Sequence, residues 1–278
     1  MTMSPRVKRS ILCWLLLLPL VVVILFPFGV MFVTALRPRD ELFVFPPTWA
    51  FSRFVWTNIT EMWEKVNFGA ALLNSIYVSV SSTLLALLFG IPAAYALSRF
   101  RFPGKGLYRQ FLLVTQMMSP IVLVLGLFRL MVVFGLVNSP NSLVFTYAAF
   151  NLAFTIWMLQ SYFNTIPHEL EEAAWIDGAS AFVSITRIFL PLAVPAMVVT
   201  AIFTFINSWN EFVLALTMLR ESDSYTLPVM VFAQVAGRYQ IEWHHVMAAT
   251  LMATVPVAIV FSWLQRYLIR GMALGAVK

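Results

Sequence analysis

The sequence has few charged residues and almost no cysteine. Asp, Glu, Lys and Arg make up only 11% of its 278 residues, whereas soluble domains carry roughly a quarter. A water-exposed surface needs those charges, so the composition excludes an ordinary soluble globular protein. The single cysteine, Cys13, excludes a disulfide within the chain and a cysteine-based metal cluster.

The sequence also lacks the side-chain patterns of common enzymes. The run from His168 to Glu172 superficially resembles the zinc-protease signature, but that signature needs a second histidine where Glu172 stands. There is no glycine-rich phosphate loop followed by Lys and Ser or Thr. We therefore expect no catalytic residue, no metal site and no bound cofactor in this chain. We interpret His244 and His245 as interfacial residues rather than metal ligands.

Hydrophobic residues, in contrast, are abundant: they form 61% of the chain, and the mean hydropathy is +0.86. A helix needs about 20 apolar residues to cross a bilayer, and six segments are long enough. We predict an all-α membrane protein with six transmembrane helices in a single domain, residues 1–278. The third span is broken by Pro120 and carries Arg129. The expected spans cover residues 11–36, 70–97, 111–136, 143–163, 188–219 and 246–268.

The basic residues lie in short segments between the apolar runs. The net charge of +6 therefore indicates membrane orientation and contact with lipid, and we expect no binding to nucleic acid. If the N-terminus is cytoplasmic, Lys and Arg are more numerous inside than outside, as is usual in membrane proteins. We predict an N-in, C-in topology. Its cytoplasmic segments include 1–10, 164–187 and 269–278, and its external loops are 37–69 and 220–245.

The cytoplasmic segment 164–187 has the pattern of a short helix, a turn and a second short segment. Pro167 suits the first turn of a helix, and the glutamates after it interact well with a helix N-terminus. Leu170, Ala173 and Ala174 would share an apolar face. Gly178 can end the helix in a left-handed conformation.

This segment resembles the EAA loop of ABC importer membrane subunits. The resemblance rests on seven fixed residues at the right spacing and on Asp177, which is typical before the glycine. We take all eight as the ATPase-coupling residues: Glu172, Ala173, Ala174, Asp177, Gly178, Ile188, Leu190 and Pro191. Further blocks resemble the carbohydrate-uptake branch, and the second permease of maltose transporters in particular. They are Asn74-Ser75, the run Ala93–Arg99, Ser208–Phe212, Met247–Ala249 and the ending from Gln265 to Lys278. Before Asn74, the first span and the loop after it resemble the family only in their order and length, without matching residues.

The resemblance implies a type I ABC importer permease fold with a cytoplasmic EAA coupling helix, in the plasma or inner membrane. It implies a second permease subunit, a homodimeric or heterodimeric ABC ATPase, and an extracytoplasmic solute-binding protein that delivers a sugar. ATP and Mg would be bound by the partner ATPase. Glu172 would meet a basic residue of that ATPase.

A polar patch late in the fifth expected span is the candidate pore or solute site. It comprises Asn207, Trp209, Asn210 and Glu211, and Arg129 is a further charged residue within an expected span. Such residues are functional hypotheses by default. They could reach interfacial water, form an Arg129–Glu211 pair, or face the solute. The same fold could instead import a phosphorylated polyol such as a glycerol phosphodiester. A membrane-embedded enzyme is a remote alternative, because the sequence offers no reactive cluster within the spans.

Overall fold

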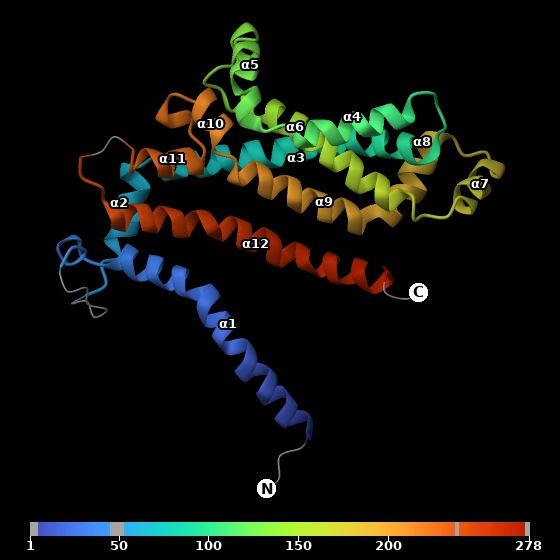
Figure 1. Ribbon diagram of the computed structural model, residues 1–278. Coiled ribbons are helices and arrows are strands. Elements are labelled where there is room, and N and C mark those ends of the chain that lie inside the picture. Colours follow the sequence, from blue (N-terminus) through green and yellow to red (C-terminus); the bar gives the residue numbers. More distant parts are fainter. Residues whose placement is uncertain (1–4, 45–52, 237–238, 276–278) are drawn as a thin grey trace. The chain divides into compact units, whose positions relative to one another are not determined.

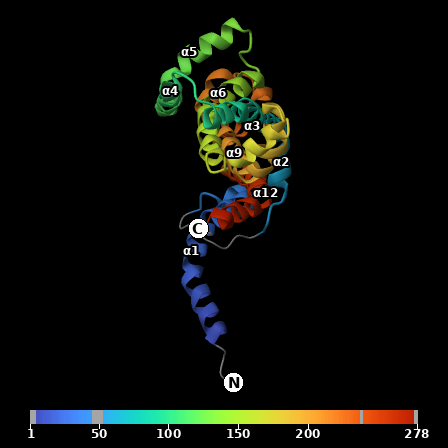
Figure 2. The ribbon, with the colours of Figure 1, turned by 90° about the vertical axis from the view of Figure 1, so that its right-hand side faces the viewer.

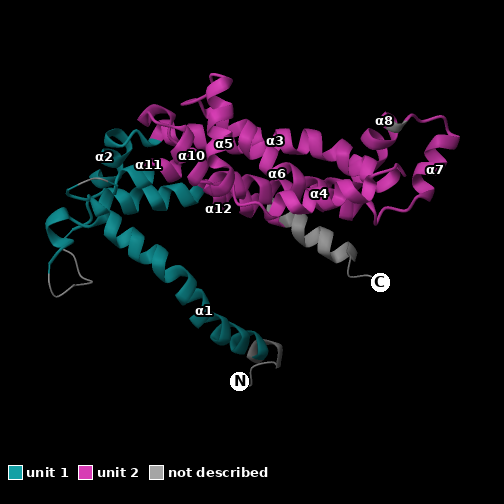
Figure 3. Cartoon of the chain, turned by 45° about the horizontal axis from the view of Figure 1, so that its top comes forward, with its two compact units in different colours: residues 1–68, 231–255 teal, residues 69–230, 256–278 magenta. Residues whose placement is uncertain are grey.

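The computed structural model describes residues 5–44, 53–236 and 239–275, and within these the regular structure is entirely helical (Figure 1). The chain divides into two compact units, residues 1–68 with 231–255 and residues 69–230 with 256–278 (Figure 3). In chain order the elements are α1 (Pro5–Leu36), η1 (Arg39–Glu41), α2 (Thr57–Lys65), α3 (Phe68–Arg99), α4 (Lys105–Met117), α5 (Pro120–Val133), α6 (Pro140–Phe163), α7 (Glu169–Ile176), α8 (Ala181–Ser184), η2 (Ile185–Phe189), α9 (Leu190–Asn210), α10 (Val213–Met218), η3 (Ser222–Ser224), α11 (Leu227–Ala233) and α12 (Trp243–Gly275).

Five helical segments are long and apolar enough to cross a membrane, and the bent pair α4–α5 brings the number to six if it counts as one span. The five cover residues 9–36, 68–99, 140–163, 182–210 and 243–263. Each overlaps a predicted segment, and α4–α5 overlaps the third. The all-helical class is therefore confirmed. Parts of the predicted segments 1–10, 37–69, 220–245 and 269–278 lie outside the described residues.

The third span is broken more sharply than a proline kink. α4 ends at Met117, α5 begins at Pro120, and the two are bent by 97°. The backbone at Met118 and Ser119 is extended, with ψ of 122° and 132°. For Ser119 the reason is Pro120, because a residue directly before proline is pushed out of the helical region. Pro120 then opens α5, where its missing N–H costs nothing. The predicted break is at the right residue, but it produces two helices rather than one kinked helix.

The predicted fifth span, residues 188–219, is also interrupted. α9 ends at Asn210 because Glu211 has an extended backbone, with φ −68° and ψ 130°. The Glu211 carboxylate then accepts hydrogen bonds from the backbone N–H groups of Leu214 (2.9 Å) and Ala215 (3.2 Å). These are N–H groups that a helix start leaves without an internal partner, so Glu211 caps α10. The apolar pattern runs on beyond this break, which is why periodicity did not reveal it.

The second unit is a bundle in which α3, α6 and α9 lie side by side and α4 lies on one flank (Figures 1 and 2). α6 packs against both α9 and α4. Small residues allow the close approach of α3 and α6: a Cβ on Gly90 would come within 2.5 Å of Thr155 Cγ2. Membrane helices commonly pack through such residues.

The two ends of this bundle carry different elements. α7 and α8 extend beyond one end, whereas α5 and α10 lie at the other (Figure 1). The segment that resembles the EAA loop is therefore at the opposite end of the unit from the Asn207–Glu211 patch.

In the first unit, α2 holds the end of α1. The Asn58 side chain is buried, and its Nδ2 donates to the carbonyl oxygens of Ala35 (2.9 Å) and Arg37 (3.0 Å). These bonds satisfy carbonyl groups that a helix end leaves free. The apolar side chains of α1 are mostly exposed, as with Trp14 and Leu16, which suits a helix whose neighbours are lipid chains.

Candidate functional site

The coupling loop, which we define as residues 164–189, contains the predicted helix and turn. α7 runs from Glu169 to Ile176, and Gly178 follows with φ +83°. The N–H groups of Gly178 and Ala179 donate to the carbonyl oxygens of Trp175 (3.0 Å) and Ala174 (2.9 Å). This pair of bonds is the Schellman arrangement that ends a helix through a left-handed residue. The predicted left-handed conformation of Gly178 is confirmed.

One side of the coupling loop is left uncovered by the described residues. We call it the outer face. Ile176 is 86% exposed and Phe182 74% exposed, and the Glu172 and Ala173 side chains are exposed as well. Exposed apolar groups beside an acidic group are typical of a docking surface. The outer face comprises Leu170, Glu172, Ala173, Trp175, Ile176 and Phe182.

The opposite side of α7 is fastened by Glu171, which the sequence interpretation missed. The side chain of Glu171 is only 2% exposed and forms an ion pair with Arg99 Nε at 3.2 Å. The Tyr95 hydroxyl donates a hydrogen bond to the same carboxylate. The sequence signal that could have pointed to Glu171 was Arg99, because a basic side chain that is buried requires an acidic partner. Nothing in the local sequence distinguishes Glu171 from Glu172.

The later coupling candidates lie where the loop joins α9 rather than on the outer face. Residues 185–189 form a π-helical turn, a feature that is rare and often found at functional sites. Ile188 and Leu190 are half-buried, and Pro191 is exposed in the first turn of α9. Asp177 is the exposed residue that ends α7. The roles of these residues in ATPase coupling stay predictions.

The Asn207–Glu211 patch borders a cavity of about 340 Å³. Asn207, Ser208 and Glu211 line it from the α9–α10 break, together with the aromatic rings of Tyr147, Phe150 and Phe154 and the polar side chains of Asn151, Thr115 and Gln116. The cavity therefore combines amide, hydroxyl, carboxylate and aromatic groups. The break between α4 and α5 contributes Met118 and Pro120 to its wall.

Hydrogen bonds fix the polar groups of this cavity. The Tyr147 hydroxyl donates to Glu211 Oε2 at 2.5 Å. Asn151 Nδ2 donates to Ser208 Oγ at 3.1 Å, and Ser82 Oγ donates to the same oxygen at 2.9 Å. Buried polar groups that are paired in this way are rigidly placed. Three helices, α3, α6 and α9, thus meet at Ser208.

Three of the predicted pore candidates lie elsewhere. Trp209 is buried and stacks on Phe205 with ring centroids 5.5 Å apart, so its ring does not face the cavity. Asn210 and Arg129 are exposed and are not among the lining residues. The Arg129–Glu211 pair that the sequence left open is absent from the described residues, where the Glu211 carboxylate is bonded to Tyr147 and to the start of α10.

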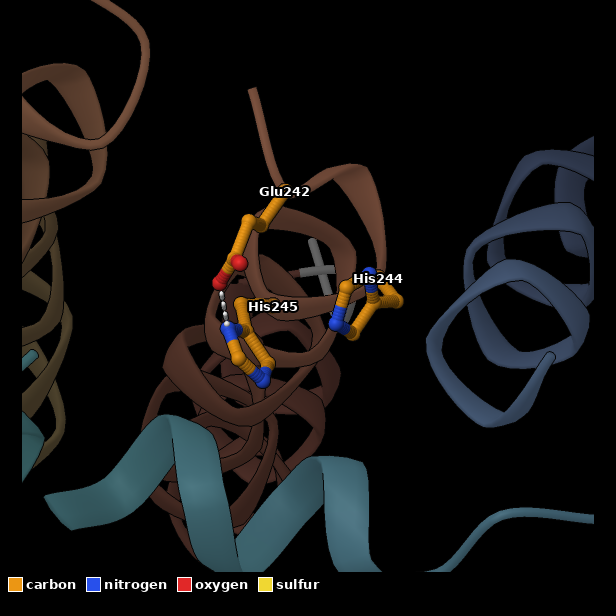
Figure 4. Close-up of side chains that lie close together, drawn as sticks. All are labelled: Glu242, His244 and His245. Atoms are coloured by element: carbon orange, nitrogen blue, oxygen red, sulfur yellow. Dashed lines mark ion pairs between the residues drawn. The ribbon is translucent and has the colours of Figure 1, made fainter. Parts of the chain in front are cut away.

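A third cluster, in the first unit, consists of Glu242, His244 and His245 (Figure 4). Glu242 Oε2 lies 2.7 Å from His245 Nδ1, and Glu242 Oε1 lies 3.3 Å from an Arg39 guanidinium nitrogen. Burial works against the ionised form of Glu242, but the interaction with His245 helps to outweigh it, so the pKa of Glu242 lies below its usual value. Both imidazoles are buried, whereas the sequence led us to expect interfacial residues.

The contacts within this cluster are ion pairs. The potential ligand atoms of Glu242, His244 and His245 all lie within 4.8 Å of one another, a spacing at which the group could also hold a metal ion. The Arg39 guanidinium also occupies one side of Glu242. We therefore assign the cluster the structural role of tying η1 to the first turn of α12.

Comparison with known proteins identifies the family to which a chain with this coupling loop and cavity belongs. Residues 86–274 match the family described as "Binding-protein-dependent transport system inner membrane component". The chain belongs to this family. It is therefore a permease component of the inner membrane, not an enzyme.

Two curated relatives cover most of the permease. It is 34% identical to the trehalose/maltose transport system permease protein MalG of Thermococcus litoralis over 277 residues, which are 99% of both chains. It is 34% identical to the diacetylchitobiose uptake system permease protein NgcG of Streptomyces coelicolor over 237 residues, 85% of this chain and 77% of that one.

A solved structure has the same fold. A chain of a bacterial ABC transporter involved in the import of the acidic polysaccharide alginate aligns with a TM-score of 0.77. The alignment covers 96% of this chain and 99% of that chain, at 22% sequence identity. The permease therefore has an ABC importer permease fold.

Proposed function

We propose that this permease is one of two membrane subunits of an ATP-driven importer for a neutral sugar. The outer face of the coupling loop is the observation that carries the proposal. It is a rigid, exposed helix with apolar side chains and one acidic group, and that is the chemistry by which a short helix docks into a groove of a partner. The permease would then open and close its path as the partner ATPase binds and hydrolyses ATP.

The proposed partners follow from this arrangement. A homodimeric or heterodimeric ABC ATPase would bind ATP and Mg, since the permease sequence has no phosphate loop of its own. A second permease subunit would complete the path, and an extracytoplasmic solute-binding protein would deliver the sugar. Another solved structure that aligns with this chain, at a TM-score of 0.65 and 17% identity, is a bacterial alginate ABC transporter in complex with an alginate pentasaccharide-bound periplasmic protein. It supports the last of these partners.

We further propose six spans, counting α4–α5 as one, with both termini in the cytoplasm. In this topology the coupling loop faces the ATPase. The bundle then places α5 and α10 toward the outside, which supports a role for the Glu211 cavity in receiving solute. The distribution of Lys and Arg agrees with this topology.

The chemistry of the cavity supports a sugar as the solute. Asn151, Asn207 and Glu211 can exchange hydrogen bonds with hydroxyl groups, and Phe150 and Phe154 offer apolar faces. Such a mixture of a few placed polar groups with aromatic walls is typical of small-molecule sites. Among the described residues that line the cavity, Glu211 is the only charged one, and Arg129 is not part of the lining. A phosphorylated polyol is therefore the less favoured solute.

The proposal is tested by reversing the charge on the outer face. In proteoliposomes that contain the complete transporter and its binding protein, Glu172→Lys should abolish ATP-dependent uptake of neutral disaccharides such as trehalose and maltose. The purified complex should also lose its ATPase subunit in detergent. Glu169→Lys is the matched control, because Glu169 is an exposed acid in the first turn of the same helix. Normal uptake and normal subunit recovery with Glu172→Lys would refute the docking assignment.

A further inference from the structure

One buried side chain, Arg99, lies at the end of α3 and contacts the coupling loop at three places: its start, its middle and its end. Its Nη2 donates to the Ile166 carbonyl oxygen at 2.7 Å, and its Nη1 lies 3.1 Å from His168 Nε2. Its Nε forms the 3.2 Å ion pair with Glu171. Its guanidinium carbon lies 4.6 Å from the centre of the Phe189 ring. These partners lie before α7, within α7 and just before α9.

The surroundings of this ion pair hold it in one geometry. The side chains of Arg99 and Glu171 are each 2% exposed. The Tyr95 hydroxyl donates to Glu171, and the Tyr95 ring packs edge-on against Phe189 with centroids 5.0 Å apart. A buried ion pair keeps both charges satisfied only while this geometry is preserved. A tilt of the coupling loop away from α3 would therefore break this ion pair and the Tyr95 hydrogen bond.

The helices attached at this point lead to the solute cavity. α3 leads back from Arg99, near its end, to Ser82, and α9, which begins directly after Phe189, leads to Ser208. At the far end the two helices are joined by the 2.9 Å bond from Ser82 to Ser208, beside the cavity-lining Asn207. A displacement of α7 can thus move α3 and α9 at the end that carries Arg99, and through them the bonded Ser82 and Ser208 beside the cavity.

We propose that Arg99, Glu171 and Tyr95 form the joint that transmits movement of the coupling loop to α3 and α9. They act as positioning residues: they touch neither the solute nor the nucleotide, and Glu171 lies outside the fixed residues of the EAA pattern. The proposal rests on the proposed docking of the ATPase at the outer face. Its signature is a loss of coupling, in which ATP hydrolysis continues while transport falls.

The test measures uptake and ATP hydrolysis in the same proteoliposomes of the complete transporter. Glu171→Gln keeps the size of the side chain but removes its charge. We expect the complex to assemble and to hydrolyse ATP, and the disaccharide taken up per ATP to fall by about five-fold or more, the scale of typical coupling between sites. Glu169→Gln, an exposed acid of the same helix, is the matched control and should leave the ratio unchanged. A purely structural role would reduce uptake and hydrolysis together, in proportion to the complex recovered.

A second variant, Tyr95→Phe, tests the proposal even if the Glu171→Gln complex does not assemble. Tyr95→Phe removes one hydrogen bond to Glu171 and leaves the ion pair, so we expect a smaller fall in the same ratio. If Glu171→Gln does not assemble, an unchanged ratio in Tyr95→Phe overturns the joint. An unchanged ratio in an assembled Glu171→Gln complex overturns it too. The two proposals can fail separately. If Glu172→Lys loses the ATPase subunit while the disaccharide taken up per ATP is unchanged in these variants, the docking assignment is supported and only the joint is rejected.

Discussion

Glu171 and Glu172 are neighbours in the sequence but point in different directions from α7. Glu172 is exposed on the outer face, whereas Glu171 is buried against Arg99 and Tyr95. Successive helix residues are turned by about 100°, so one step along the chain separates a contact with a partner from a contact within the chain. The same residue type therefore serves two roles, which are distinguished by burial alone.

Gly178 gives the prediction that belongs to this scale. A side chain at its φ of +83° is strained by roughly 1–2 kcal/mol, although a Cβ would meet no atom within 4 Å. We expect Gly178→Ala to lower the thermal stability of the purified transporter slightly and to weaken coupled uptake. Gly178→Val should do so more strongly, because β-branched residues rarely adopt positive φ.

The control for Gly178 is Gly106, a glycine in α4 where a Cβ would also have open space and φ is not positive. Gly106→Ala should be neutral or slightly stabilising, since alanine is the better helix former. Equal effects of the alanine substitutions at 178 and 106 would show that the turn does not require the left-handed conformation.

At the scale of the helices, α3 and α6 approach each other closely at Gly90 and Thr155. A Cβ on Gly90 would lie 2.5 Å from Thr155 Cγ2 and 3.2 Å from Thr155 Cβ, and Thr155 is fully buried. We expect Gly90→Ala to push the two helices apart and to cost about 1–3 kcal/mol, as overpacking typically does. Thermal unfolding of the purified permease complex measures the loss.

The double variant separates overpacking from other effects of the alanine. Thr155→Ser removes the methyl group that the new Cβ would strike, so Gly90→Ala should cost less in that background. Gly126→Ala on α5, where a Cβ would meet nothing within 4 Å, should have little effect. If the serine background gives no relief, the Gly90–Thr155 contact does not set the helix spacing.

The helices also show how far the sequence determines the fold. Apolar length located the five long apolar helices and the bent pair α4–α5, and Pro120 and Gly178 located a break and a turn, because these signals are local. The break at Glu211 was missed, since it depends on a carboxylate that bonds forward to Leu214 and Ala215 and sideways to Tyr147. Glu171 was missed for the same reason: its partner Arg99 is distant in the sequence. Trp209 was misplaced because an aromatic residue beside polar neighbours can face either way on a helix.

At the scale of the whole molecule, the proposed solute path predicts a pattern of chemical accessibility. Cysteine placed at Asn207 or Gln116, which line the cavity from α9 and α4, should react with a small water-soluble thiol reagent. Cysteine at Thr204, which is fully buried on α9, should not. The background lacks Cys13, which is otherwise exposed.

The same variants report on alternating access. In the assembled transporter, the reactivity at 207 and 116 should change when ATP is trapped on the partner ATPase, because the path is then open to the other side. If neither cysteine reacts in either state, the cavity lies off the solute path. If both react equally in the two states, the cavity is not gated by the ATPase.

The bonding of Glu211 sets a limit on how tightly a solute could be held there. A carboxylate offers about four lone-pair positions, and Tyr147, Leu214 and Ala215 use three of them. The one that remains is on Oε1, which accepts only from Leu214 among the described residues. A sugar could therefore place a single hydroxyl on this carboxylate, and any second hydroxyl would compete with the cap of α10. Transient binding of this kind suits a residue along a path, where a solute must leave as readily as it enters.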